Sequence, residues 1–278
     1  MCTLHRTCPI KTFSIGFTET QYDEAKYAFE VASHLRTDHT ELYITPQDAY
    51  DIIPTLPDIY DEPFADSSQI PTMLLSNFAS KYVKVALSGD GGDELFGGYN
   101  RYLLGAKYFK YNKYIPQRLN KPFIKSLNYI PENILGIIFN LLINNKISNK
   151  IDHIKIKKIK EKINFINNKF EFYISMISEF NNLKILNSEI NDNTEYYEDL
   201  FQQNSYLSFH EAMMHSDFEN YLSDDILCKV DRSSMHSSLE ARCPFLNSDL
   251  IKNSYLMPSK FKINNNITKF ILKDILDS

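Results

Sequence analysis

A glycine-rich, acidic segment that directly follows a short apolar run places the strongest constraint on how this chain can fold. Five of its eight glycines lie in SGDGGDELFGG, from Ser88 to Gly98. The preceding run, 83–87 (VKVAL), predicts a buried strand. Open α/β sheets bind ligands at the carboxyl ends of their strands. A glycine loop in this place therefore favours a parallel sheet with a binding loop at its edge.

The same segment carries three carboxylates, Asp90, Asp93 and Glu94. Glycine lets backbone N–H groups approach a phosphate closely. Because carboxylates repel bare phosphate, the pattern predicts a divalent cation between them. The segment is not a Walker A loop, since no Gly-Lys-Ser/Thr follows Gly97, and Glu94 stands where the dinucleotide-binding pattern requires glycine. A purely structural turn would not need five glycines and three acids.

Strand and helix patterns alternate before this loop. We predict, in order, a strand over 11–17, a helix whose apolar residues repeat from 25 to 35, a strand over 39–45, and helices over 46–56 and 71–82. Alternating elements of this kind predict a doubly wound, mostly parallel sheet. The fold class is therefore α/β.

The composition changes after residue 108. Residues 110 to about 204 are rich in Ile, Asn and Lys, so we predict an α/β core over 1–108 and a large helical part over 109–278. The basic run 154–160 (IKIKKIK) is interpreted as a solvated helix face. The weaker alternative is a nucleic-acid surface, which the net charge of −5 argues against.

The four cysteines show no zinc-binding spacing, and we interpret them as reduced thiols of a cytoplasmic protein. The longest apolar run, 134–143, is about half of the ~20 residues that a membrane helix needs. We therefore expect neither nucleic acid nor a membrane as a partner.

A second charged segment covers 224–247. On a predicted helix, Asp225, Lys229 and Arg232 lie at i, i+4 and i+7, on one face. This charged face either lines a binding site for a nucleotide or an acidic substrate, or carries an ordinary exposed i,i+4 ion pair. Glu240 and Arg242 are interpreted as a structural ion pair.

The segment VALSGDGGDELFGGYNRY resembles the second signature of the synthetase (C-terminal) domain of bacterial glutamine-dependent asparagine synthetases. KTFSIGF, Asp61-Glu62-Pro63 and LCKVDRSSM…LEARCPFLN are similar to family segments in the same order. The resemblance covers most of 1–108 and 220–273. It implies an ATP-pyrophosphatase (adenine nucleotide α-hydrolase-like) fold. It also implies a carbon–nitrogen ligase that converts aspartate and ATP to aspartyl-AMP and then amidates it with ammonia from glutamine.

The resemblance also implies roles for single residues, with ATP and Mg²⁺ as cofactors. Asp90 and Asp225 match catalytic acids, and the spacing leaves Asp231 as an alternative to Asp225. Asp93 matches the acid linked to magnesium and pyrophosphate. The matching nucleotide-binding positions are Ile15, Ser88 and Gly89.

Two family features are not found at their expected places. The first signature, S-G-G-x-D-S, is expected before KTFSIGF, where the chain has MCTLHRTCPI. Ten residues cannot form an N-terminal glutaminase domain, so Cys2 after Met1 is interpreted as accidental. A phosphate-binding lysine segment is expected beyond NITKFILKDIL.

We therefore expect an incomplete fragment with little synthetase activity by itself. The missing first strand would leave an unpaired sheet edge, so we also expect poor solubility. A separate chain carrying the pyrophosphate loop and the glutaminase domain is a further expectation. One alternative is a non-catalytic remnant that binds a partner through its helical middle. Another is a family member that amidates a different carboxylate, such as a sugar acid.

Overall fold

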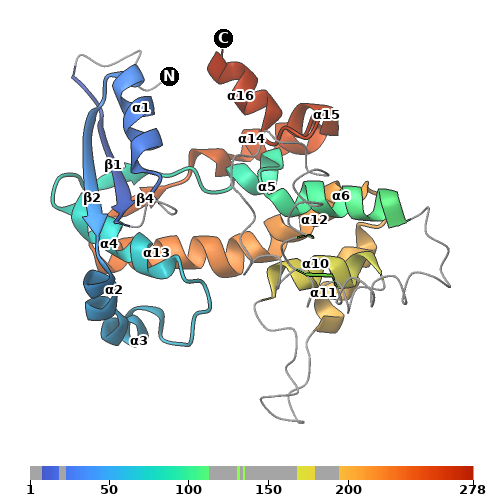
Figure 1. Ribbon diagram of the computed structural model, residues 1–278, viewed down its shortest axis with the longest axis horizontal. Coiled ribbons are helices and arrows are strands. Elements are labelled where there is room, and N and C mark those ends of the chain that lie inside the picture. The colour runs from blue at the N-terminus through green and yellow to red at the C-terminus, as the bar shows by residue number, and fades with distance from the viewer. Residues whose placement is uncertain are drawn as a thin grey trace. The chain divides into compact units, whose positions relative to one another are not determined.

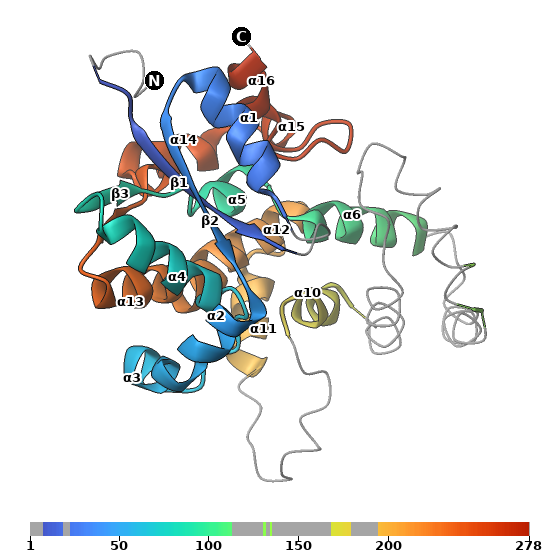
Figure 2. The ribbon, with the colours of Figure 1, turned by 60° about the vertical axis from the view of Figure 1, so that its left-hand side comes forward.

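The computed structural model describes residues 8–18, 23–112, 130–131, 134, 168–178 and 194–277 (Figures 1 and 2). The chain forms two compact units. The first consists of 1–91 and 219–255, and the second of 92–218 and 256–278. Both units thus take residues from either side of residue 108, where the composition changes, because the segment 219–255 returns to the first unit. The basic run 154–160 and Cys2 lie outside the described residues.

The first unit contains a strand–helix–strand motif. Strand β1 (Lys11–Phe17) pairs in parallel with β2 (Asp38–Ile44), in a register that runs from Lys11 opposite Asp38 to Phe17 opposite Ile44. Helix α1 (Ala25–Leu35) connects the two strands and packs beside them (Figure 1). This arrangement confirms a mixed α/β structure with parallel strands.

A second pair of parallel strands lies in the same unit. Strand β3 (Val85–Leu87) pairs with β4 (Glu240–Arg242), which the sequence patterns did not predict. Three residues are too few to show alternation, so β4 carries no periodic signal. The expected Glu240–Arg242 ion pair is present at 2.8 Å on the surface. Within the described residues the strands form two two-stranded sheets, so a single doubly wound sheet is not seen.

Proline divides the helical region that the sequence predicted over 46–56. Helix α2 (Pro46–Ile52) begins at a capping box, in which the Thr45 side chain accepts from the Asp48 N–H. A 3₁₀ turn, η2 (Ile53–Thr55), and α3 (Leu56–Tyr60) follow it. Pro54 and Pro57 explain this break, because proline removes the N–H that would continue an α-helix.

Three further helices belong wholly or mostly to the first unit. They are α4 (Gln69–Ser80), α13 (Cys228–His236) and α14 (Ser248–Leu256). Helix α13 packs against α3, α4 and β4, and Figure 2 shows α4 running beside it. A short 3₁₀ turn, η5 (Pro244–Leu246), follows β4.

Within the described residues, the second unit is helical. Its helices are α5 (Gly92–Phe96), α6 (Asn100–Asn112), α10 (Lys169–Ile177), α11 (Thr194–Gln203), α12 (Phe209–Ser216), α15 (Ser259–Lys262) and α16 (Phe270–Asp277). Aromatic and methionine side chains form its core, among them Tyr102, Phe172, Phe201, Phe209 and Met213. In the described part of the chain, no helix combines the length and apolar character that crossing a membrane requires.

A buried carboxylate organises the second unit. Asp217, which is fully buried, begins the π-helical segment η4 (Asp217–Leu227) that continues α12. It accepts hydrogen bonds from Arg101 Nε at 2.9 Å, from Tyr102 at 2.6 Å and from Tyr173 at 3.0 Å, and Arg101 Nη2 completes the ion pair at 2.8 Å. Burial raises the pKa of Asp217, while the guanidinium and the two hydroxyls oppose that shift. These bonds tie α6 and α10 to the end of α12.

Replacing Arg101 by Met should lower the free energy of unfolding by about 3–5 kcal/mol, because it leaves the Asp217 carboxylate buried without its counter-ion. Urea unfolding measures this change. As a control, Tyr173→Phe removes one hydrogen bond to the same carboxylate and should cost less, about 1.5–3 kcal/mol. Equal, small losses in both variants would contradict the central role of the ion pair.

Candidate functional site

The glycines of the 88–98 segment have very different surroundings. A Cβ atom added to Gly89 would meet no atom within 4 Å. Gly91 has a φ of +86° and lies against Leu246, and Gly97 has a φ of +69° and lies against Ile263. Gly98 lies against the Asp93 and Lys269 side chains. Among these four glycines, Gly89 alone leaves open space in which another group can approach the backbone.

Ser88 and Asp90 hold each other at the carboxyl end of β3. The Ser88 N–H donates to the carbonyl of Arg242 at 2.9 Å, which extends the β3–β4 pairing by one residue. The Ser88 hydroxyl donates to the Asp90 carboxylate and accepts from the Asp90 N–H at 3.3 Å. Both side chains are half-buried. The structure thus brings together three of the predicted site residues, Ser88, Gly89 and Asp90.

A thiol that the sequence patterns did not single out lies beside this loop. The Cys243 sulfur is 3.6 Å from the Ser88 hydroxyl. Burial raises the pKa of Cys243, and the contact with Ser88 opposes that shift. The two residues are 155 positions apart in sequence, so no local pattern could have revealed the contact.

Asp93, which belongs to the second unit, has a cationic partner. Lys269 Nζ lies 2.9 Å from Asp93 Oδ1, and the two side chains are 33% and 35% exposed. The sequence predicted a magnesium ion at Asp93 and did not identify Lys269. Within the described residues, no group of three or more His, Cys, Asp or Glu side chains is arranged to hold a metal ion.

Glu94 is buried, whereas the other two acids of the segment, Asp90 and Asp93, are partly exposed. It is 2% exposed and accepts a hydrogen bond from the Tyr99 hydroxyl at 2.7 Å. Burial raises the pKa of its carboxyl. Glu94 therefore fixes α5 to the residues that follow it.

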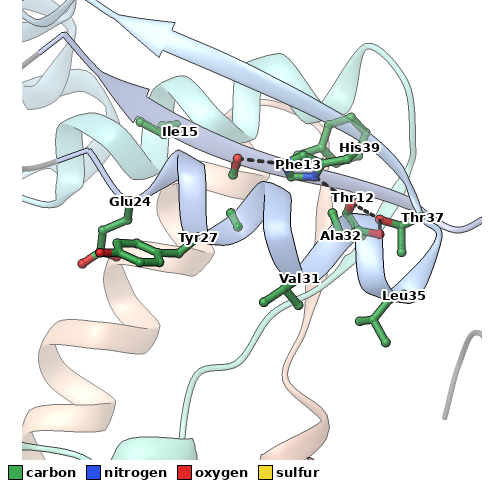
Figure 3. Close-up of a pocket in the computed structure, with 12 residues that line it drawn as sticks. Thr12, Phe13, Ile15, Glu24, Tyr27, Val31, Ala32, Leu35, Thr37 and His39 are labelled. Atoms are coloured by element: carbon green, nitrogen blue, oxygen red, sulfur yellow. Dashed lines mark hydrogen bonds between the residues drawn. The ribbon is translucent and has the colours of Figure 1, made fainter. Parts of the chain in front are cut away.

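Ile15 lies in an open groove of about 610 Å³ formed by β1, α1 and β2 (Figure 3). The polar residues of the groove lie around the His39 ring. This ring is hydrogen-bonded to the Thr12 hydroxyl at 2.9 Å and to the Ser14 hydroxyl at 3.1 Å. The residues of the 88–98 segment are not among those that line the groove. The structure therefore shows Ile15 in a separate hollow of the same unit.

The apolar wall of this groove comes from one face of α1. Tyr27, Val31 and Leu35 lie four residues apart, line the groove and are 65%, 59% and 43% exposed. Figure 3 shows Val31 and Leu35 projecting from the helix on the same side. Exposed apolar side chains beside a strand edge are typical of a surface that another element covers.

The charged residues of α13 hold a loop of the first unit. Lys229 donates to Asp66 at 2.5 Å and to Ser68 at 2.6 Å, and Arg232 pairs with Asp61. Although burial opposes it, Lys229 and Ser68 hold the pKa of Asp66 below its usual value. The two cations thus pair with acids more than 160 residues away, which corrects the interpretation as an ordinary i,i+4 pair, while a face towards a nucleotide or acidic substrate stays a prediction.

Asp225 lies in the π-helical segment η4, before α13 begins at Cys228. The α-helical spacing of Asp225, Lys229 and Arg232 therefore does not describe their arrangement. Asp225 is half-buried, and its alternative, Asp231, is exposed on α13. The assignment of the second acid stays a prediction.

Comparison with known proteins identifies the class to which this loop belongs. A family model described as asparagine synthase matches residues 1–278. The chain therefore belongs to the asparagine synthase family, a family of ligases. This confirms the resemblance that the glycine-rich signature carried.

Several relatives support the assignment. The chain is 31% identical over 268 residues to glutamine-hydrolyzing asparagine synthetase 1 of Bacillus subtilis, covering 95% of this chain and 39% of that protein. It is 40% identical over 95 residues to glutamine-hydrolyzing asparagine synthetase 3 of Arabidopsis thaliana, covering 32% and 16%. It is 36% identical over 95 residues to asparagine synthetase B of Escherichia coli, covering 32% and 16%. The chain thus spans about two fifths of the length of the Bacillus relative.

The raised pKa of Cys243 predicts slow alkylation near neutral pH. Because burial favours the neutral thiol, the reaction of Cys243 with iodoacetamide should be slower at pH 7 than that of exposed Cys8, and should reach its half-maximal rate at a higher pH than that of a free cysteine thiol. Mass spectrometry of the two peptides across pH 7–10 measures both rates. Faster reaction of Cys243 than of Cys8 at pH 7 would contradict its described environment.

Proposed function

We propose that this chain contributes the Ser88–Asp90 part of an ATP site in an ATP-pyrophosphatase-type domain. The open space at Gly89, at the end of β3 and within the family signature, carries the proposal. In the proposed reaction, the side-chain carboxylate of aspartate attacks the α-phosphorus of ATP, and pyrophosphate leaves. Ammonia derived from glutamine then attacks the acyl carbon of aspartyl-AMP, and AMP leaves as asparagine forms.

The loop geometry suits nucleotide binding. Ser88 is anchored to β4 through its N–H, so the backbone at Gly89 is held in place while its Cα side stays open. A phosphate or ribose can approach such a backbone closely. Ile15, in the groove beside α1, is the proposed adenine contact through its backbone.

The carboxylates of the proposed site have different roles in proton transfer and in metal binding. Asp90 is the proposed acid at the reacting centre, where a carboxylate can take a proton from the attacking ammonia. Asp225 is the proposed second acid, with Asp231 as its alternative. Asp93 is the proposed ligand of Mg²⁺, which neutralises phosphate charge when bound.

The free thiols Cys8, Cys228 and Cys243 agree with a cytoplasmic location, which is part of the proposal.

The full reaction needs more of the family's sequence than these residues, because the chain spans 39% of its Bacillus relative. We propose that a strand carrying the first family signature pairs with the β1 edge that β2 does not occupy. The exposed stripe of Tyr27, Val31 and Leu35 supports this, since a strand and its connection would cover it. The same polypeptide or a separate chain can supply this strand.

Substitution of single glycines tests the nucleotide site. Gly89→Ala should leave the free energy of unfolding within about 0.5 kcal/mol, because the added methyl meets open space. It should weaken ATP binding about tenfold by obstructing the backbone. Calorimetric titration with ATP in the presence of Mg²⁺ measures the affinity.

The matched control is Gly91→Ala. Its positive φ and its contact with Leu246 predict a loss of about 1–2 kcal/mol in the free energy of unfolding. If Gly89→Ala binds ATP as well as the unaltered chain does, the loop does not bind the nucleotide in the proposed way.

Release of AMP tests the reaction. With aspartate, ammonia, ATP and Mg²⁺, the 278 residues alone should release little AMP. A polypeptide that also carries the first-signature strand should be at least about tenfold faster, and Asp90→Asn should remove that gain. Faster release with a sugar acid than with aspartate would reassign the acceptor. Equal release with and without the added strand would contradict its proposed role.

A further inference from the structure

The ion pair between Asp93 and Lys269 belongs to a built arrangement rather than to a chance surface contact. Lys269 directly precedes α16, which packs against α5, the helix that carries Asp93. Nζ lies 2.9 Å from Oδ1, and each side chain is about one-third exposed. The pair is therefore reachable by water and by ions.

The chain conformation on both sides fixes the pair. Before Lys269, a tight turn is closed by mutual backbone hydrogen bonds between Asn264 and Ile267, of 2.7 and 3.0 Å. Lys269 itself has a φ of +51°, in the left-handed region. On the other side, a Cβ at Gly98 would collide with Asp93 Oδ1 and Lys269 Cε. Glycine at position 98 is thus what lets the ammonium reach the carboxylate.

The donor chemistry of Asp93 fits a hydrated divalent cation. Mg²⁺ is commonly held by one or two carboxylates together with waters and substrate phosphates. Asp93 can therefore contribute one carboxylate to such a site, with water molecules as the other ligands when no nucleotide is bound. The ammonium of Lys269 already occupies the position of a cation at Oδ1.

We propose that Lys269 is a positioning residue that holds the Asp93 carboxylate in place, and that it competes with a divalent cation for that carboxylate. This inference rests on the proposed role of Asp93 in metal binding. Two cations at one carboxylate oxygen repel each other, so binding of either one weakens the other. Lys269 then lowers the intrinsic metal affinity of Asp93 while keeping its side chain in position.

Mn²⁺ binding, followed by electron paramagnetic resonance without nucleotide, tests the competition. Lys269→Met should bind Mn²⁺ about two- to fivefold more tightly than the unaltered chain, as expected for losing a partly exposed competing ion pair. The matched control is Lys273→Met, which removes the same charge one turn further along α16. Lys273 is exposed and forms no ion pair within the described residues, so this control should bind as the unaltered chain does. Asp93→Asn should remove the Asp93-dependent part of the binding and with it the difference between Lys269→Met and the unaltered chain.

Acylation of lysines in the unaltered chain provides a second measurement that needs no variant to fold. Adding Mg²⁺ should speed the modification of Lys269 by an N-hydroxysuccinimide ester, because the ammonium is released from Asp93, and should leave Lys273 unchanged. Neither experiment uses ATP or turnover, so a failure of the proposed reaction would not affect them. Unchanged or weaker Mn²⁺ binding by Lys269→Met, or no Asp93-dependent binding in any form, would overturn the inference.

Discussion

The parallel pairing of β3 with β4 is the contact on which the candidate site depends. It joins Val85–Leu87 to Glu240–Arg242, and the Ser88 N–H continues it by donating to Arg242. Directly after β4, Leu246 packs against Gly91, so the chain segment after β4 lies under the glycine loop. Without this long-range pairing, neither end of Ser88–Gly91 would be held.

The β4 segment is in turn held by α13, which precedes it. Lys229 and Arg232 bind acids of the Asp61–Ser68 loop, and the Tyr60 hydroxyl lies 2.7 Å from that of Ser233. Since the Lys229 pair is largely buried, loss of one partner would leave an uncompensated charge. The charges that first suggested a binding surface thus position the strand on which the loop rests.

The local structure could be predicted where the signal lies within one element. The predicted strand over 11–17 matches β1, and the contact between Ser88 and Asp90 joins residues only two positions apart. The strand β4 could not be predicted, because three residues are too few to show a period. The partners of Lys229, Cys243 and Asp93 lie far away in sequence, so only the fold reveals them.

The glycines show the same limit. Their clustering suggested one phosphate cradle, yet Gly91, Gly97 and Gly98 each accommodate a side chain of the protein. Of these four glycines, Gly89 alone has open space beside its Cα atom, so it can face a ligand. The other three are needed because a side chain packs closely against each of them. The sequence shows how many glycines the segment has, but the role of each glycine depends on which neighbouring atoms approach it in the fold.

We propose above all that the backbone from Ser88 to Asp90 binds the nucleotide. Hydrogen–deuterium exchange with and without a non-hydrolysable ATP analogue and Mg²⁺ tests it most directly, because each backbone amide reports on its own protection. We expect slower exchange in peptides that contain Ser88–Asp90, with little change in the described helices α10 and α11. Unchanged exchange at Ser88–Asp90 under saturating analogue would contradict it.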